Sequence, residues 1–359
     1  MKRLVLVLIA AAALAPAAAR SAACSPLNCA SSQFTVGGGT LLAVRGAVSK
    51  PVRVLDLQTG ALRWQLPAGI AAGNMLVHQD GRSVVWYDAA RGVRVKQAIV
   101  PAAGFYLAGV SQSGTTAVLQ RTARDTTLLL LTPAHVRTIS LPGKTWSFDA
   151  LRNDRLFLIK QLKYGYQVRL FDLAANQLRA APLKDPHESS TIWGSPFSRV
   201  ASNDGRYLFT LYIGEDGGAM VHVLDLAKAT ARCVDLVGDG DFSAATTYAL
   251  AVSPDARTLW AISPGYGRAL TIDVRAHRVV NAFRFDPDSW SGGAAGMAAL
   301  APDGKRIAVT ESEHVWLVDP QARSVTKPVP MTAWGLGFSP NGKTLWAVGA
   351  SDRATAVDL

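Results

Sequence analysis

The sequence predicts an all-β fold built from one repeated unit of four short strands, and three observations support it. Apolar residues make up 49% of the 359 residues, which is enough for a large core. Tetrapeptides rich in Asp and Gly recur along the chain, and each precedes a short apolar run that is typical of a strand. No stretch of about 10 to 15 residues after the N-terminal segment keeps a 3.6-residue apolar period, so we expect few helices.

The N-terminal segment MKRLVLVLIAAAALAPAAA has a basic start, an apolar stretch and then small residues. Its apolar run is shorter than the ~20 residues that cross a bilayer, so it predicts a signal peptide and not a membrane span. Cleavage after Ala19 and cleavage after Ala23 both fit a small-x-small pattern, and the choice stays open. We therefore expect a signal peptide over residues 1–23, an exposed tail over residues 24–32, and a secreted or periplasmic (cell-envelope) location.

The three cysteines are interpreted from this expected location. Cleavage after Ala23 would leave Cys24 at the mature N-terminus, as at a lipoprotein site, although Ser21 stands where an aliphatic residue is usual. A membrane partner is expected only if Cys24 is lipidated. The other interpretation is that Cys24 and Cys29 form a local disulfide in the tail, while Cys233 is a small apolar side chain.

The repeat has two elements that alternate along the chain. The first is a turn and a strand, such as SNDGRYLFTL from Ser202, and the second is a longer segment such as VRVLDLQTGALRWQL from Val52. Together they predict four antiparallel strands per unit, and the mean spacing of about 43 residues is that of a propeller blade. The key turn position falls at Asp80, Ser113, Asp154, Asp204, Asp255, Asp303 and Asn341.

The number of blades follows from counting these units. Starting at Thr40 there are seven complete pairs of hairpins and a last unit, TLWAV…TAVDL, that lacks its outer strand. We expect a single propeller domain over residues 33–359 with eight blades, closed by a strand near residues 33–36 that pairs with the last blade. Seven blades is the alternative, because the unit from His78 to Pro101 is short.

The pattern SPDGKxLxV followed by VxVxDL resembles the YVTN and WD-type repeats of bacterial β-propellers, a group that includes TolB-like and lactonase-like proteins. The resemblance covers almost all of residues 34–359 and implies a fold without implying one activity. Some of these propellers hydrolyse lactones or transfer electrons with a quinone cofactor at the channel mouth. The resemblance therefore implies a propeller enzyme as one alternative, and a lipid-anchored TolB-like assembly component as another.

The acidic residues divide between the two edges that such blades have. One edge carries the turns of the repeat, where Asp side chains accept backbone hydrogen bonds and so have a structural role. The turn carboxylates are Asp56, Asp80, Asp154, Asp172, Asp204, Asp225, Asp255, Asp273, Asp303, Asp319 and Asp358. The loops of the fourth to seventh units, at the other edge, contain Asp185, Glu188, Glu215, Asp216, Asp239, Asp241, Asp286, Asp288, Glu311 and Glu313.

Aromatic side chains accompany this second set of carboxylates, and such a mixture is suited to a cation, a cationic peptide or a polyol. The other interpretation is that these carboxylates are ordinary loop residues screened by water. The candidate ligand-binding residues outside the acidic set are Tyr164, Tyr166, His187, Tyr266, Trp290 and His314. We expect an exported, monomeric, non-catalytic module that binds a protein, a peptide or an envelope glycan.

Other kinds of site find less support in the sequence. The segment VGDGDF from Val237 has the alternating Asp residues of a calcium loop but no bidentate Glu at the required distance, so calcium is an option and no other cofactor is expected. No nucleophile elbow or zinc-binding His pattern is present. The formal charge of +11 falls to +8 when residues 1–23 are removed, and no basic run reaches four residues, so a nucleic acid partner is not expected.

Overall fold

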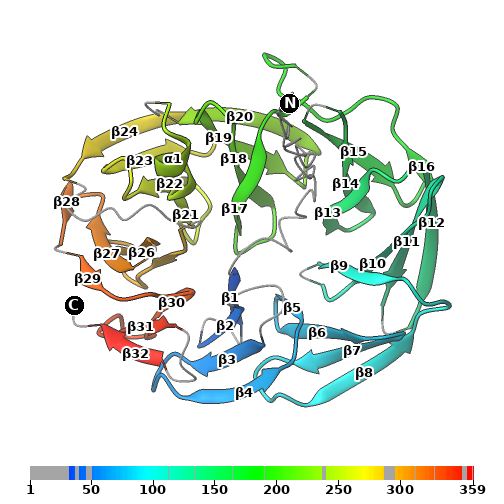
Figure 1. The fold of residues 1–359 in the computed structure, drawn as a ribbon, viewed down its shortest axis with the longest axis horizontal. Helices are drawn as coiled ribbons and strands as arrows, with labels where there is room; N and C mark the ends of the chain where they lie inside the picture. The colour runs from blue at the N-terminus through cyan, green and yellow to red at the C-terminus, as the bar shows by residue number, and fades with distance from the viewer. Residues whose placement is uncertain are drawn as a thin grey trace, which may run out of the picture.

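The computed structural model shows a ring of β-sheets that surround a central axis (Figure 1). It describes residues 32–36, 40–45, 51–111, 113–132, 134–163, 165–189, 191–236, 240–286, 296–311, 313–326, 328–349, 354–357 and 359. The eight sheets follow one another along the chain as the blades of an all-β propeller. The predicted signal peptide and Cys24 lie outside the described residues. In the described part of the chain, no helix is long and apolar enough to cross a membrane.

The first four blades each have four antiparallel strands, with the first strand innermost and the fourth at the rim. Their strands are β1 (Ser32–Val36), β2 (Leu41–Arg45), β3 (Val52–Asp56), β4 (Leu62–Leu66), β5 (Ile70–Ala72), β6 (Met75–Asp80), β7 (Ser83–Asp88), β8 (Arg94–Ile99), β9 (Tyr106–Val110), β10 (Thr116–Arg121), β11 (Asp125–Leu131), β12 (Val136–Pro142), β13 (Trp146–Arg152), β14 (Arg155–Gln161), β15 (Tyr166–Asp172) and β16 (Gln177–Leu178).

The remaining four blades include one short helix and one extra strand, β29, which pairs with β27. Their elements are β17 (Ser195–Ala201), β18 (Tyr207–Ile213), β19 (Ala219–Asp225), β20 (Thr230–Leu236), α1 (Phe242–Thr246), β21 (Ala249–Val252), β22 (Thr258–Ser263), β23 (Arg268–Asp273), β24 (Arg278–Arg284), β25 (Ala298–Leu300), β26 (Ile307–Glu311), β27 (His314–Asp319), β28 (Ser324–Val325), β29 (Val329–Pro330), β30 (Gly335–Phe338), β31 (Leu345–Val348) and β32 (Ala354–Val357).

The burial of each strand depends on its place in the blade. The third strands are covered on both faces by neighbouring blades, and every residue of β3 is buried. In the rim strand β8, by contrast, each residue is either exposed or half-buried. Large side chains such as Trp86 and Trp316 fill the space between blades and are almost completely buried. The core is therefore a ring of apolar layers between sheets, and function is confined to the edges, the rim and the channel.

The prediction of eight blades is confirmed. The unit from His78 to Pro101, which prompted the seven-blade alternative, belongs to a complete four-stranded sheet formed by β5 to β8. The last blade has three strands among the described residues, β30 to β32.

The predicted closure by pairing of the N- and C-terminal strands is wrong. Strand β1 pairs with β2 in the first blade, with Gln33 opposite Val44, and the last blade is formed by later residues only. The physical reason is that only four positions separate β1 from β2 along the chain, so these strands pair with little loss of chain entropy. Each blade is therefore contiguous in the sequence.

Side chains close the ring between the last blade and the first. The amide of Gln33 donates to the carbonyl oxygen of Ala298 at 2.7 Å and accepts from the backbone N–H of Leu336 at 2.7 Å. The indole of Trp346 donates to the carbonyl oxygen of Leu57 at 2.8 Å. Three blades are thus linked by hydrogen bonds that span almost the whole chain, with no exchange of strands.

The turn carboxylates have the structural role that the sequence predicts. Asp56 Oδ1, for example, accepts from the backbone N–H groups of Gln58 and Thr59. The structural role of Asp80 and Asp154 stays a prediction, and Asp358 lies outside the described residues. Equivalent side-chain acceptors of turn N–H groups are Asp172, Asp204, Asp225, Asp255, Asp273, Asp303 and Asp319.

Candidate functional site

Each blade has two edges, which we call the turn edge and the loop edge. The turn edge carries the reversals between the first and second strands and between the third and fourth strands. The loop edge carries the reversal between the second and third strands together with the connection to the next blade. The predicted binding residues belong mostly to loops of this second kind, so the sequence assigns them to the correct edge of the blades.

Three loop segments of blades 5 and 6 touch one another at the loop edge. A Cβ atom on Gly194 would lie 2.5 Å from the carbonyl oxygen of Ile213, and one on Gly217 would lie 2.6 Å from the carbonyl carbon of Gly240. Both glycines also have a positive φ, so no other residue fits these close approaches without strain. The hydroxyl of Tyr266 donates to the carbonyl oxygen of Asp241 at 2.7 Å.

We call the resulting group the acidic loop cluster. Glu215 and Asp216 are exposed in the turn between β18 and β19. Trp193 is 59% exposed and Phe242 is 41% exposed, which is unusual for such large apolar side chains. Carboxylates and aromatic rings are therefore presented together to solvent. The acidic loop cluster comprises Trp193, Glu215, Asp216, Asp241, Phe242 and Tyr266.

Asp241 has a structural duty within this cluster. Its Oδ1 accepts from the backbone N–H groups of Ser243 and Ala244, at 2.8 and 3.2 Å, and so caps the first turn of α1. The ring of Phe242 packs edge-on against Phe197 of β17, with centroids 5.7 Å apart. The short helix thus joins blade 6 to blade 5 while it exposes an aromatic edge.

Asp185, His187 and Glu188 lie in the connection between blades 4 and 5 that also contributes Trp193, but Asp185 is held against the rim strand of blade 5. Asp185 is buried and accepts from the backbone N–H groups of His187 and Cys233, both at 2.9 Å. Burial opposes ionisation of Asp185, but these hydrogen bonds and the charge of Arg232 hold its pKa below the usual value. Asp185 therefore ties the connection to the rim strand β20, while His187 and Glu188 lie exposed beside it.

Blade 7 carries a separate group of the predicted residues. His314 Nδ1 lies 3.5 Å from Glu311 Oε2, and the side chain of Glu311 is fully buried. Glu313 in the same hairpin and Asp286 after β24 are exposed. Glu311 and His314 thus form a pair inside the hairpin between β26 and β27 of the next blade along the ring, with Glu313 exposed at its tip.

Tyr166 is half-buried between blades 4 and 5, and its ring centroid lies 6.2 Å from that of Tyr212. Its burial raises its pKa. Tyr164, Asp239, Asp288 and Trp290 lie outside the described residues. Within the described ranges, no three His, Cys, Asp or Glu side chains are arranged to hold a metal ion. The calcium interpretation of residues 237–242 remains a prediction, because half of that segment is not described.

The sequence analysis missed a hollow of about 500 Å³ at the turn edge of the same two blades. We call it the basic pocket, because four cationic side chains and a histidine line it with one carboxylate, Asp225. The cationic residues occur in the turns of two neighbouring repeats, SNDGRY, DLAKATAR and DVRAHR, and this local density was the available signal. The basic pocket comprises Arg206, Lys228, Arg232, Arg275 and His277.

No protein-family model matches the chain, and no curated protein matches it in sequence. Among solved structures it is similar to the Dos1 propeller, with a TM-score of 0.57 and 11% identity over 92% of each chain. It is also similar to AztD of Citrobacter koseri, with a TM-score of 0.52 and 14% identity over 83% of this chain and 86% of that one.

The dihydro-heme d1 dehydrogenase NirN gives a TM-score of 0.53 and 14% identity over 84% of this chain and 66% of that one. These proteins have different names and, where stated, different roles, and none is more than distantly similar in sequence. At such identities the likeness shows the fold alone. The chain is therefore an eight-bladed β-propeller, and its function has to be argued from its own residues.

Proposed function

We propose that the chain is an exported, non-catalytic propeller of the YVTN/WD-repeat kind that binds a cationic segment of a partner protein or peptide through the acidic loop cluster. One observation carries the proposal: Trp193 and Phe242 are exposed in contacting loops that also present Glu215 and Asp216. Aromatic faces and carboxylates attract Lys and Arg side chains by different means, the ring quadrupole and the ion pair.

The charge of the whole chain makes this local arrangement informative. With 37 Lys and Arg against 26 Asp and Glu, the protein repels a cationic ligand in general. A cationic peptide that binds must therefore find a region where the local charge is reversed. Glu215 and Asp216 supply such a region, because their side chains are exposed and adjacent in one turn.

The test is titration calorimetry with an octalysine peptide at low salt. Reversal of two exposed charges in Glu215→Lys/Asp216→Lys should weaken binding roughly tenfold. The control Asp80→Lys/Asp125→Lys makes the same charge change at exposed sites of blades 2 and 3 and should stay within about twofold. Equal losses in both variants would show that net charge, not the cluster, governs binding.

A glycan is the other ligand that aromatic and acidic side chains can hold. Titration of the same protein with a neutral glycan distinguishes this ligand class from a cationic peptide. If neutral chitohexaose binds in a Trp193-dependent manner while octalysine does not, the ligand class proposed here is wrong. If octalysine binds and chitohexaose does not, the proposal stands. Melting curves of each variant show whether the changes leave the propeller folded.

A further inference from the structure

The geometry points to a second binding site at the opposite edge of blades 5 and 6, where the basic pocket takes a small ligand that carries two or more oxyanion groups, phosphate or carboxylate. Its volume of about 500 Å³ is within the usual range for a small-molecule site. Strands and turns of both blades form its walls, so it exists only in the assembled ring.

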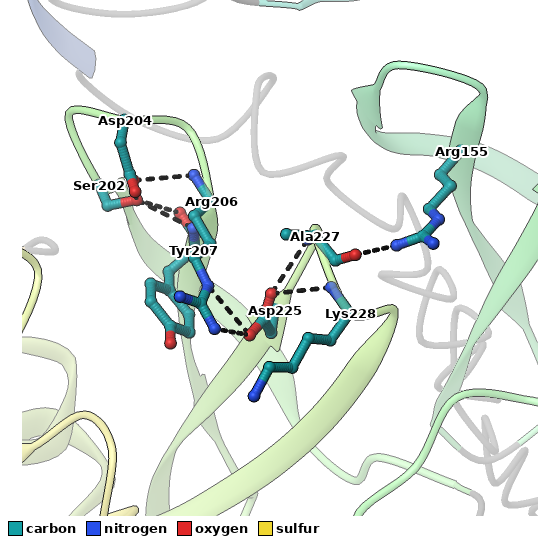
Figure 2. A network of polar contacts seen from close by, with 8 residues as sticks. All are labelled: Arg155, Ser202, Asp204, Arg206, Tyr207, Asp225, Ala227 and Lys228. Atoms are coloured by element: carbon teal, nitrogen blue, oxygen red, sulfur yellow. Dashed lines mark hydrogen bonds and ion pairs between the residues drawn. The ribbon is translucent and has the colours of Figure 1, made fainter.

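The basic pocket contains more positive charge than its carboxylate can balance. Arg206 is neutralised, because its Nε and Nη2 donate to Asp225 Oδ2 at 3.2 and 2.8 Å (Figure 2). The other oxygen of Asp225 accepts from the backbone N–H groups of Ala227 and Lys228, both at 3.0 Å. The one carboxylate that lines the pocket is therefore fully used by these four hydrogen bonds.

The other cations of the pocket keep their charge available. Among the described residues, no carboxylate forms an ion pair with Lys228, Arg232 or Arg275. Arg232 donates only to the carbonyl oxygen of its neighbour Ala231, which leaves most of its guanidinium N–H groups for a ligand. Guanidinium groups bind carboxylate and phosphate in the same bidentate way.

One wall of the pocket is preformed. The guanidinium of Arg206 lies 4.8 Å from the ring centroid of Tyr207, and the ion pair with Asp225 fixes it there. Tyr207 stacks on Phe209, with centroids 5.8 Å apart, and Val223, which also lines the pocket, is buried. This wall is thus a rigid part of the blade core, whereas the exposed side chains of Lys228 and Arg275 lose rotamer freedom when a ligand binds.

His277 adds a half-buried imidazole to the pocket. It lies in the turn between β23 and β24 with a positive φ, as do the residues at the equivalent position of the other blades, Gly60, Gly92, Asn176, Ala229 and Arg323. Its imidazole can donate to an oxyanion.

A second hollow at the turn edge serves as a comparison, because it has a smaller excess of positive charge. It measures about 510 Å³ between blades 7 and 8, and Asp303, Arg306 and Lys343 supply its charges. Arg306 donates to the carbonyl oxygen of Gly342 at 3.0 Å, and a carboxylate lines the same hollow. Concentrated positive charge is thus a property of the pocket between blades 5 and 6 and not a general consequence of the repeat.

The experiment is calorimetric titration of the full chain with pyrophosphate and, separately, with citrate. We expect one of them to bind with a stoichiometry of one per chain, and the double variant Arg232→Ala/Arg275→Ala to lose roughly tenfold to hundredfold in affinity. Pyrophosphate binding identifies a phosphorylated ligand, and citrate binding identifies a polycarboxylate. Both binding at this pocket would support the shared oxyanion chemistry.

The matched control is Arg94→Ala/Lys144→Ala, which removes the same charge from exposed positions of other blades and should change affinity less than about twofold. Lys228→Ala, at an exposed side chain of the pocket, should lose roughly threefold and keeps the test valid if the double variant is unstable. The proposal is overturned if neither anion binds, or if control and pocket variants lose affinity equally.

Discussion

Blades 5 and 6 carry opposite charge at their two edges, although both edges contain carboxylates. At the turn edge, Asp225 is bound by Arg206 and by two backbone N–H groups, so the cations around it dominate. At the loop edge, Asp216 accepts a hydrogen bond from Gly218 at 3.0 Å and otherwise faces solvent. The number of carboxylates alone therefore does not decide the charge of a surface, because the cationic side chains beside them count equally.

The largest expected effect comes from reversing the charge of each edge in a separate variant. Glu215→Lys/Asp216→Lys should lose octalysine binding and keep the oxyanion binding, whereas Arg232→Glu/Arg275→Glu should do the opposite, each by roughly tenfold or more. Calorimetry of both variants with both ligands is the measurement. If either variant loses both ligands, the two edges are not separate sites and the comparison fails.

The next effect distinguishes a structural carboxylate from an available one. Asp225→Ala should lower the free energy of unfolding by about 1–3 kcal/mol, because several donors lose their acceptor, whereas Asp216→Ala should lower it by less than about 0.5 kcal/mol. Because Arg206 is one-third exposed, the ion pair itself contributes only a part of this value. Urea unfolding at pH 7 measures both.

The same pair of variants gives a pH dependence with a defined sign. Burial alone would raise the pKa of Asp225, but the hydrogen bonds from Arg206 and from the backbone lower it below the ordinary value. A carboxyl with a lowered folded-state pKa contributes stability above its unfolded pKa of about 4 and loses it as the pH falls through the folded value. The difference between wild type and Asp225→Ala should therefore shrink below about pH 4. A constant difference down to pH 2 would contradict the assignment.

A smaller effect concerns His277 in the basic pocket. Burial and then the charge of Arg232 lower its pKa, so it is largely neutral at pH 7 before a ligand binds. A bound oxyanion favours the imidazolium, and affinity for sulfate should rise about threefold as the pH falls from 8 to 5.5. His277→Gln should remove this rise.

Sulfate is chosen because its own charge is constant over this range. The carboxyl groups near His277 are Asp185, Asp225 and Asp273, and all three have lowered pKa values, so they stay ionised throughout. A pH dependence that persists in His277→Gln would point to another group and would weaken the assigned role of the histidine.

An effect of similar size tests the aromatic part of the acidic loop cluster. Trp193→Ala should weaken octalysine binding by about twofold to fivefold, the size of a solvent-exposed cation–π contact. Leu62→Ala removes another exposed apolar side chain, in blade 1, and should leave binding unchanged. If both variants bind octalysine as the wild type does, the cluster acts through its carboxylates alone.

Much of the fold could be predicted because its determinants are local. The turn carboxylates bond to N–H groups two or three residues ahead, so a short sequence pattern contains the whole interaction. The place of β1 could not be predicted in this way. Residues 33–36 suit either the inner strand of the first blade or the missing outer strand of the last blade, and the prediction was wrong because a strand pattern does not encode its partner.

The candidate site was only partly predictable for the same reason. Sorting by loops placed Glu215, Asp216, Asp241 and Tyr266 at one edge, and the structure brings them together. It could not show that Asp185 is buried and bonded to Cys233 of the next blade. Nor could it show that Arg232 and His277, which belong to different repeats, meet in one pocket.

The sequence by itself determined the repeat, the eight-bladed all-β ring and the edge to which most loops belong, because these follow from patterns within one unit. The Asp80 turn is an exception, since it joins β6 to β7 and so lies at the loop edge instead of the predicted turn edge. The tertiary structure alone decided how the ring closes, which loops of neighbouring blades touch, and where charge is left unpaired. The physical reason is that side chains from separate repeats must meet before their hydrogen bonds and ion pairs exist. Surface charge in a propeller is therefore a property of the assembled blades.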